Sequence, residues 1–278
     1  MADPAETTPR ITVDYEKPKL GALARLRQRF VLVLFVILFI LGSLVMLLAA
    51  CLTLFQARRF YAEGIGKVLA RLGLWMHGVR LVVHRSEPWP SGQVVYISNH
   101  TSALDVLIYI ALGLPNTRYF MGGFLRTLLP LWVIAGCMGT FWTPPQTLTE
   151  KRRALFRRAS ALLARTGESV FLTPEGQKCW VFNRGAFHLA MSLKAPIVPF
   201  FITIPPDIDP GPWKGHYGSE IRPGEVHVHF KPAVPTADWE LSELDQQREA
   251  FRRMYYDWGV ALNDKSVLAP EAADLASS

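Results

Sequence analysis

A histidine and an aspartate spaced for acid–base chemistry follow a short apolar stretch. Residues 94–98 read Val-Val-Tyr-Ile-Ser, and the next seven residues, Asn-His-Thr-Ser-Ala-Leu-Asp, contain His100 and Asp105. A strand that ends here places His100 on a strand-to-helix turn and Asp105 in the first turn of the next helix. A carboxylate near an imidazole accepts its Nδ1 proton and leaves Nε2 as a base. The pattern therefore indicates general-base catalysis, with Asp105 also stabilising the imidazolium that forms.

The same spacing has a purely structural explanation. Ser102 and Asp105 form a Ser-x-x-Asp pattern, which is typical of a helix capping box. On this interpretation Asp105 only caps a helix, and His100 is an ordinary turn residue. The spacing alone does not decide between the two.

Three further blocks follow along the chain. Thr-Pro-Glu-Gly at 173–176 comes directly after a strand pattern, Gly-Ala-Phe stands at 185–187, and Pro-Ile-Val-Pro stands at 196–199. Ligands of open α/β sheets bind where the carboxyl ends of strands meet. We therefore expect 173–176 to lie near His100.

These four blocks, in this order and at these separations, resemble the glycerolipid acyltransferases, the superfamily of 1-acylglycerol-3-phosphate O-acyltransferases. The resemblance covers about residues 79–202. It implies an acyltransferase in which His100 is the catalytic base and Asp105 orients it. It also implies that Glu175, with Pro174 and Gly176, shapes the acceptor pocket. The strand at 196–199 would contribute to the acyl-donor side.

The chain departs from the family pattern in three places. The second block usually ends in Phe-x-x-Arg, whose arginine grips the phosphate of the acceptor, but residues 139–144 read Gly-Thr-Phe-Trp-Thr-Pro. The third block carries Thr173, Gln177 and Lys178 where Phe, Thr and Arg are usual, and a later lysine is replaced by Arg184 one residue on. Lysine lacks the bidentate fork of arginine, so the acceptor headgroup stays open. The substrate-binding residues implied by the blocks are Asn99, Thr140, Thr143, Thr173, Pro174, Glu175, Gly176, Gln177, Lys178 and Arg184.

The implied reaction moves a fatty acyl group from acyl-CoA or acyl carrier protein to the hydroxyl of a lysolipid, giving a diacyl lipid for phospholipid synthesis. The first-choice acceptor is 1-acylglycerol-3-phosphate (lysophosphatidic acid). The alternatives are a lyso-aminolipid, such as lyso-ornithine lipid, or another lysophospholipid. The thioester is a co-substrate, and no cofactor or metal is implied. Three aromatic residues are suspected of lining the acyl-chain pocket: Trp132, Phe141 and Trp142.

Strand and helix patterns alternate through the rest of the chain and predict an α/β domain, a mixed sheet flanked by helices. Strand patterns lie at 79–84, 94–98, 117–121, 169–172, 197–202 and 226–230, and helical patterns at 103–113, 147–165, 185–193 and 240–262. Thr147 and Glu150 predict a capping box for the second of these helices. Its basic face either is solvated or meets a lipid or CoA phosphate; it contains Arg152, Arg153, Arg157 and Arg158.

An uncharged run from Phe30 to Phe55 exceeds the roughly 20 residues that cross a bilayer as a helix. Basic residues flank it on both sides, which leaves the positive-inside rule undecided. The run predicts either a single tilted span or a re-entrant hairpin broken at Gly42-Ser43. A lipoprotein-like cleavage box at 48–51 is disfavoured because the leader before it is too long. Residues 57–77 predict a helix that lies on the membrane or packs on the core.

The predicted organisation is a loose basic tail (1–29), a membrane-anchoring helical segment (30–78), a catalytic domain (79–264) and a flexible tail (265–278). Thirty Lys and Arg against 23 Asp and Glu give a net charge of +7, which favours anionic partners such as lipid headgroups. Three scattered cysteines exclude a disulfide framework or a cysteine-based zinc site. We expect a membrane protein with its catalytic domain on the cytoplasmic face and an undetermined oligomeric state.

Three rival functions follow from the same residues. A metal-dependent hydrolase could combine His100 and Asp105 with His227 and His229, although their alternation with apolar residues favours solvated histidines on a half-buried strand. No partner pattern assigns a role to His84. A non-catalytic lipid-binding protein would not need the His100, Asp105 and Glu175 set. Nucleic-acid binding rests on the positive charge alone, because no recognition motif accompanies it.

Overall fold

A mixed seven-stranded sheet forms the centre of the molecule. The computed structural model describes residues 21–100, 102, 104–175, 181–205, 207–209, 221–262 and 264. The strands are β1 (Val79–His84), β2 (Val95–Ser98), β3 (Thr117–Gly122), β4 (Phe141–Thr143), β5 (Ser169–Leu172), β6 (Ile197–Thr203) and β7 (Gly224–Phe230). Their order is β1-β7-β6-β2-β5-β3-β4, and only the β6–β7 pair is antiparallel among these strands. The predicted α/β fold class is confirmed.

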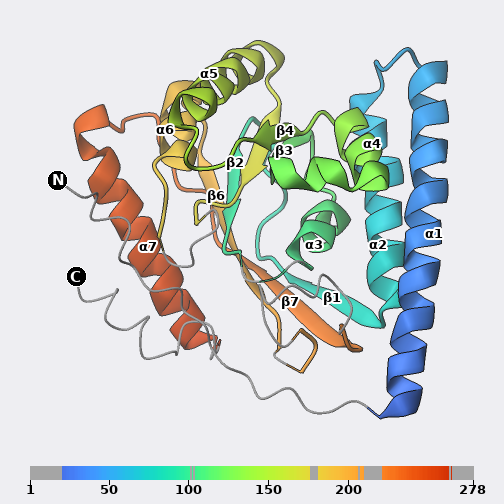
Figure 1. Cartoon of the computed structure of the whole chain (residues 1–278). Coiled ribbons are helices and arrows are strands. Elements are labelled where there is room, and N and C mark those ends of the chain that lie inside the picture. Colours follow the sequence, from blue (N-terminus) through green and yellow to red (C-terminus); the bar gives the residue numbers. More distant parts are fainter. Residues whose placement is uncertain are drawn as a thin grey trace.

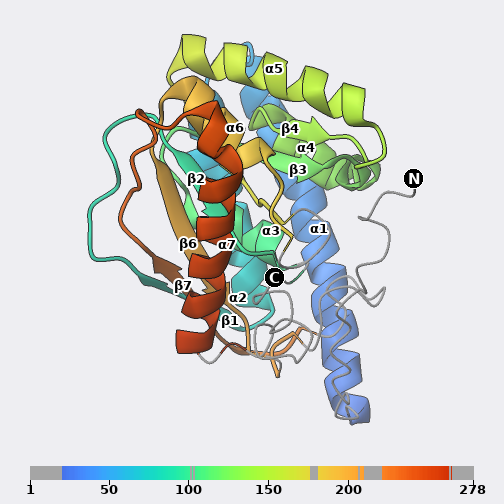
Figure 2. The same ribbon diagram turned by 90° about the vertical axis from the view of Figure 1, so that its left-hand side faces the viewer.

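Helices cover both faces of this sheet (Figures 1 and 2). One face carries α1 (Ala22–Leu52), α2 (Lys67–Met76), α3 (Asp105–Leu112) and α4 (Leu129–Cys137), and the other carries α5 (Thr149–Thr166), α6 (Gly185–Leu193) and α7 (Leu244–Ala261). Successive side chains of β2 alternate between the two cores that result. Tyr96 joins the core under α1 and α3, whereas Val95 and Ile97 join the core under α6 and α7.

The apolar segment forms one continuous helix, α1, so the hairpin predicted to break at Gly42-Ser43 is wrong. A Cβ added to Gly42 would lie 2.6 Å from the Leu69 side chain, so this glycine permits close packing of α1 on α2. The Ser43 hydroxyl donates to the Ile40 carbonyl 2.7 Å away, within the helix. Both residues therefore serve packing within and between helices, and neither ends α1.

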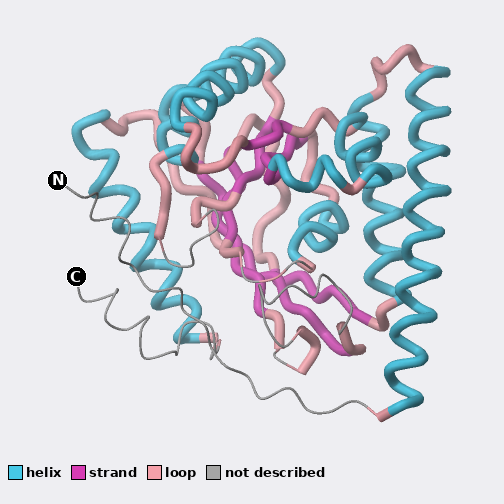
Figure 3. The backbone as a smooth tube through the Cα atoms, viewed as in Figure 1, coloured by secondary structure: helices cyan, strands magenta, loops and turns pink. Residues whose placement is uncertain are grey.

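The chain reverses direction after α1 instead. Leu54 and Phe55 have positive φ angles, and the chain returns through a π-helix (Phe60–Gly66) into α2, which lies alongside α1 (Figure 3). Arg58 fastens this reversal to the sheet, because its Nη1 donates to the Thr117 carbonyl over 3.1 Å. In α2, Leu69 is buried and Trp75 is exposed, so the helix packs on the core and still presents apolar surface outwards.

Among the described residues, α1 is the one helix whose length and apolar composition would suit a membrane crossing. Its 31 residues would extend about 46 Å. Met46 and Ala50 on α1 are fully buried in the main core, which integrates this helix with the sheet domain and opposes its removal as a leader. The helix begins at Ala22, so the last eight residues of the predicted 1–29 tail are helical. Residues 1–20 and 265–278 lie outside the described part.

The six predicted strands and the four predicted helices of the α/β domain all form, with small shifts at their ends. Two short elements escaped prediction, α4 and β4. The predicted capping box is wrong: α5 begins at Thr149, and no side chain caps it. Glu150 instead accepts a 2.7 Å hydrogen bond from Arg153 on the same helix. Two 3₁₀ helices, Gly123–Thr127 and Leu241–Glu243, precede α4 and α7.

Candidate active site

The turn between β2 and α3 brings His100 and Asp105 into direct contact. Nδ1 of His100 lies 2.8 Å from Oδ2 of Asp105. The aspartate is fully buried, and the histidine side chain is 16% exposed. A buried carboxylate at this distance fixes the tautomer that carries its proton on Nδ1, so that Nε2 is the nitrogen that can accept a proton.

Asp105 also holds the turn itself. The same Oδ2 atom accepts a 2.9 Å hydrogen bond from the backbone N–H of Ser102, and the Ser102 hydroxyl accepts one from the N–H of Leu104. One carboxylate oxygen therefore both contacts the imidazole and organises the turn that leads into α3.

Buried polar groups hold the end of β2 in place. The Asn99 side chain bonds both backbone groups of Ile202 on β6, with its Oδ1 2.8 Å from the nitrogen and its Nδ2 2.9 Å from the oxygen. The hydroxyl of Tyr109 donates to the Asn99 carbonyl over 3.0 Å. Burial, and then the charge of Asp105, raise the pKa of Tyr109, so it stays a neutral donor. Asn99 therefore positions the turn and does not line the cavity described below.

The loop after β5 comes to the same edge, as its strand-end position predicts. The buried carboxylate of Glu175 accepts a hydrogen bond from the backbone N–H of His100 across 3.4 Å. The Pro174 carbonyl accepts two 2.8 Å hydrogen bonds from Asn183, one from the backbone and one from the side chain. These contacts hold the loop against the histidine turn.

A mostly apolar cavity of about 650 Å³ opens beside His100. Its walls come from α1, α3, the 3₁₀ helix, the start of α4 and the strand ends; examples are Phe35, Leu104, Phe124 and Leu128. This volume lies within the range of ligand pockets, about 300–1,000 Å³. The lining excludes Trp132, Phe141 and Trp142, so the suspicion that these aromatics form its wall is wrong.

The predicted substrate-binding residues divide into three groups. Three of them line the cavity: Thr143, Thr173 and Pro174. Four lie outside its lining: Asn99, Thr140, Glu175 and Arg184. The remaining three lie outside the described residues: Gly176, Gln177 and Lys178.

Arg184 is directed elsewhere. It forms an ion pair with Asp245 at the start of α7, with its Nε 2.7 Å from Oδ1 of the aspartate. Its side chain is 65% exposed. Arg184 therefore joins the loop before α6 to α7 at the surface.

Arg152 supplies a cation in the cavity wall. It stands in the first turn of α5, and its Nη1 donates to the Pro144 carbonyl over 3.1 Å. Burial lowers the pKa of its guanidinium, because desolvation disfavours the charge. The sequence placed Arg152 on a basic helix face with three other arginines, and nothing in that pattern distinguished it from them.

Comparison with known proteins finds a matching protein family and several similar proteins. The Acyltransferase family model matches residues 80–203, which contain both His100 and Asp105. The chain resembles the 1-acyl-sn-glycerol-3-phosphate acyltransferase of Cocos nucifera, at 23% identity over 69% of this chain and 62% of that protein. It also resembles the 1-acyl-sn-glycerol-3-phosphate acyltransferase alpha of Homo sapiens, at 28% identity over 58% of this chain and 57% of that protein. The chain thus spans less than two thirds of the length of these relatives.

A solved structure has the same fold. The crystal structure of the 1-acyl-sn-glycerophosphate (LPA) acyltransferase PlsC from Thermotoga maritima superposes with a TM-score of 0.64. The superposition covers 85% of this chain and 95% of that one, at 18% sequence identity. The likeness therefore extends beyond the matched domain to most of the described helices and strands.

Proposed function

Because the chain belongs to the glycerolipid acyltransferase superfamily, we propose that it transfers a fatty acyl group from a thioester donor to the hydroxyl of a lysolipid. The observation that carries this proposal is the 2.8 Å contact between His100 and buried Asp105 beside an apolar cavity of about 650 Å³. The imidazole can take the hydroxyl proton, and the cavity can accept a fatty chain.

The reaction proceeds without a covalent acyl-enzyme. The acceptor hydroxyl gives its proton to Nε2 of His100 as its oxygen attacks the thioester carbonyl carbon. The tetrahedral intermediate then collapses, the carbon–sulfur bond breaks, and the imidazolium returns its proton to the departing thiolate. General-base catalysis of this kind contributes about 10²–10⁴-fold in rate. Asp105 stabilises the imidazolium between the two proton transfers.

The oxyanion needs hydrogen-bond donors. Gly185 and Ala186 open α6 and line the cavity. Backbone N–H groups in the first turn of a helix have no acceptor within that helix and suit a developing negative charge. Gly185 also allows this turn to lie close to α5, because a Cβ there would lie 2.8 Å from the Phe156 ring.

The first-choice acceptor is lysophosphatidic acid. The relatives named above are 1-acyl-sn-glycerol-3-phosphate acyltransferases, and Arg152 places a guanidinium in the wall of the cavity that His100 lines. Guanidinium groups recognise phosphate through paired N–H donors. A different lysolipid, such as lyso-ornithine lipid or another lysophospholipid, is the alternative acceptor. The donor is acyl-CoA or acyl carrier protein.

The enzyme works at the membrane, with the catalytic domain on the cytoplasmic face. Phe35 and Phe39 of α1 line the same cavity as His100, so the apolar helix and the catalytic turn share one wall. An acceptor held in a leaflet beside α1 would reach the cavity without crossing water, while a thioester donor would approach from solution.

The decisive experiment is an acyl-transfer assay of the purified full-length protein in detergent, with a panel of lysolipids and with both donor types. We expect a diacyl product with lysophosphatidic acid. We expect no product from His100→Ala, whose fold is checked by circular dichroism. If only another lysolipid gave product, that lysolipid would be the acceptor in place of lysophosphatidic acid. Lysolipid binding without turnover by any donor would favour a non-catalytic lipid-binding protein, and full activity in His100→Ala would refute the mechanism.

A further inference from the structure

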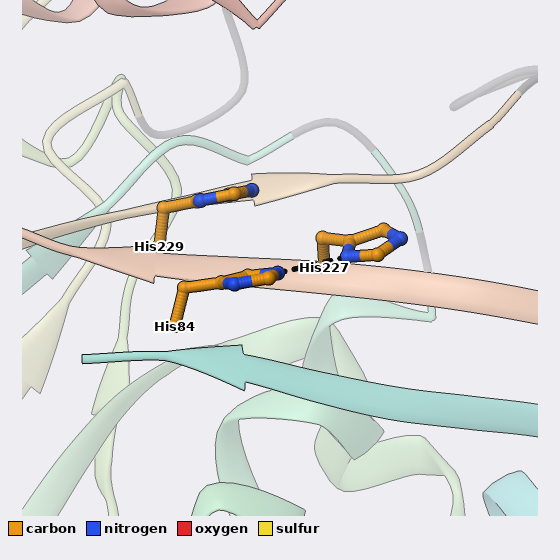
Figure 4. Close-up of side chains that lie close together, drawn as sticks. All are labelled: His84, His227 and His229. Atoms are coloured by element: carbon orange, nitrogen blue, oxygen red, sulfur yellow. Dashed lines mark hydrogen bonds between the residues drawn. The ribbon is translucent and has the colours of Figure 1, made fainter.

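Three histidines gather on the strand pair β1 and β7 at one end of the sheet (Figure 4). His84 ends β1, and His227 and His229 lie on the neighbouring strand β7. One ring nitrogen from each histidine can be chosen so that the three lie within 4.8 Å of one another. Nε2 of His84 is 2.9 Å from Nδ1 of His227, and the rings of His84 and His229 stack with centroids 4.3 Å apart.

The strand register produces this cluster. β1 and β7 are parallel, and Val82 pairs with His227 while His84 pairs with His229. Residues two apart on a strand share a face, so His227 and His229 stand side by side and His84 faces them from the next strand. A strand pair therefore holds three imidazoles on one surface without help from any loop.

We propose that His84, His227 and His229 bind a divalent transition-metal ion, with Zn²⁺ as the first choice. Imidazole nitrogen suits Zn²⁺, Cu²⁺ and Ni²⁺, and three histidines with one open position form a known zinc ligand set. Zn–N bonds of about 2.0–2.1 Å in a tetrahedron require nitrogens about 3.3 Å apart. One pair of nitrogens is 2.9 Å apart and every pair lies within 4.8 Å, so side-chain rotations could bring the three nitrogens to this spacing.

A carboxylate lies beside the proposed ligand set, at ion-pair distance and not in hydrogen-bond contact. Oε2 of Glu225 lies 3.9 Å from Nε2 of His227, which is the ring nitrogen opposite the one that faces His84. Metal-binding histidines commonly present their second nitrogen to a carboxylate, which fixes the ring and raises its basicity. Glu225 is itself held by Arg80 of β1, whose Nε lies 3.1 Å from Oε1.

The cluster is separate from the proposed acyl-transfer chemistry. Val226 and Val228, which alternate with the histidines, join the core that also contains residues of α1 and α3. His227 and His229 therefore lie on the opposite face of β7, and no member of the cluster lines the cavity. A bound ion would fasten β1, the strand at one end of the sheet, to β7. The inference stands whether or not the chain transfers acyl groups.

The test is metal binding by the full-length protein, produced without a polyhistidine tag, solubilised in detergent and stripped with a chelator. Titration calorimetry with Zn²⁺ should give one ion per chain, and Zn²⁺ should raise the Tm of the wild-type protein. His84→Ala and His229→Ala should each weaken binding by more than about tenfold, because each removes one of three ligands. His188→Ala, at an exposed position on α6, is the matched control and should bind as the wild type does.

The measurements distinguish loss of a metal ligand from loss of the fold. His84 is exposed, so its truncation leaves the core intact, and circular dichroism verifies the fold of each variant. Sub-stoichiometric Zn²⁺ in the wild type, or equal binding by wild type and His84→Ala, would overturn the site. Stoichiometric Ni²⁺ or Cu²⁺ binding that needs all three histidines, without Zn²⁺ binding, would overturn the choice of ion and support the site.

Discussion

Nη1 of Arg152 lies 3.1 Å from the carbonyl oxygen of Pro144, and Pro144 occupies the position of the family's phosphate-gripping arginine. In the pattern Phe-x-x-Arg, Phe141 is the first residue and position 144 is the last. The guanidinium of Arg152, in the first turn of α5, thus lies next to position 144, where this chain has no arginine. Since Arg152 also lines the cavity beside His100, this cation is suited to the acceptor headgroup.

We expect Arg152→Ala to raise the KM for lysophosphatidic acid by about 10–100-fold, with a smaller change in kcat. A hydrogen bond to a charged group contributes about 1.5–3 kcal/mol, which corresponds to this range. Arg152→Lys should recover part of the loss, because lysine keeps the charge and lacks the fork. Initial rates in mixed micelles at varied acceptor concentration measure both constants.

Arg153→Ala is the matched control for this measurement. Arg153 is the next residue on the same helix, its side chain is 66% exposed, and it pairs with Glu150. We expect wild-type kinetics from it. A KM that is unchanged in Arg152→Ala, or raised equally in Arg153→Ala, would show that α5 acts only through its general positive charge.

Asp105→Asn should lower kcat by about 10²–10⁴-fold with little change in KM. One oxygen of Asp105, Oδ2, faces both the Ser102 N–H and Nδ1 of His100. An asparagine that keeps its oxygen there is neutral, and one that turns its amide nitrogen there donates and cannot accept the Nδ1 proton. In either orientation the negative charge that stabilises the imidazolium is lost. Steady-state assays with circular dichroism as a fold control measure the effect, and activity near that of the wild type would remove Asp105 from the mechanism.

The sequence was sufficient to predict the parts of the site that are local along the chain. His100, Ser102 and Asp105 lie within six residues, so one strand-to-helix turn fixes their contacts. The strands were predictable for a similar reason, since short runs of β-branched and aromatic residues separated by turns specify them. Neither inference requires knowledge of distant residues.

Features that depend on tertiary packing were not predictable. Gly42 reads as a helix breaker, yet it is a contact for Leu69, which lies 27 positions further along the chain. In the sequence Arg152 is one of four equivalent arginines, and only the packing of α5 over the strand ends distinguishes it. The sequence gives His84 no partner, because only the parallel register of β1 and β7 places it beside His229. Apolar residues lie all around α4, so it had no helical periodicity to detect.

The stability of the fold should depend on pH through Glu168. Its carboxylate, just before β5, pairs with Nε of Arg58 at 2.5 Å and also binds Arg118. Burial tends to raise the pKa of Glu168, but the hydrogen bond from Arg118 and the charge of Arg58 outweigh it. The pKa therefore lies below its ordinary value of 4.5. A folded-state pKa below the unfolded value gives stability that is present above that value and is lost as the pH falls through the folded pKa.

Glu168→Gln should lower the free energy of unfolding by about 3 kcal/mol near neutral pH, because it leaves two partly buried arginines without their counter-charge. The Tm difference between wild type and variant should begin to shrink as the pH falls below the ordinary value of 4.5, and it should vanish once the pH is below the lowered folded-state pKa, where the wild-type carboxyl also becomes neutral. Glu150→Gln, in an exposed pair with Arg153, should have almost no effect at any pH. A Glu168→Gln difference that does not decrease as the pH is lowered from 7 through 4.5 and beyond would contradict this assignment.

The outer face of α1 carries the last prediction. Leu44 and Leu48 are 58% and 61% exposed, and they lie on the side of α1 away from buried Met46 and Ala50. Exposed apolar surface of this kind marks contact with a membrane or another protein. Replacing both leucines with glutamate should weaken binding to phospholipid vesicles, because a charged side chain within a bilayer costs about 2.5–3.5 kcal/mol.

Vesicle flotation of detergent-depleted protein measures this binding, and circular dichroism should show an unchanged fold because neither side chain enters the core. Leu241→Glu is the control, since Leu241 is 68% exposed on the short 3₁₀ helix before α7. We expect the control to float with the vesicles and the Leu44→Glu, Leu48→Glu variant to stay in solution. Equal flotation of the two would mean that Leu44 and Leu48 do not contribute to membrane binding.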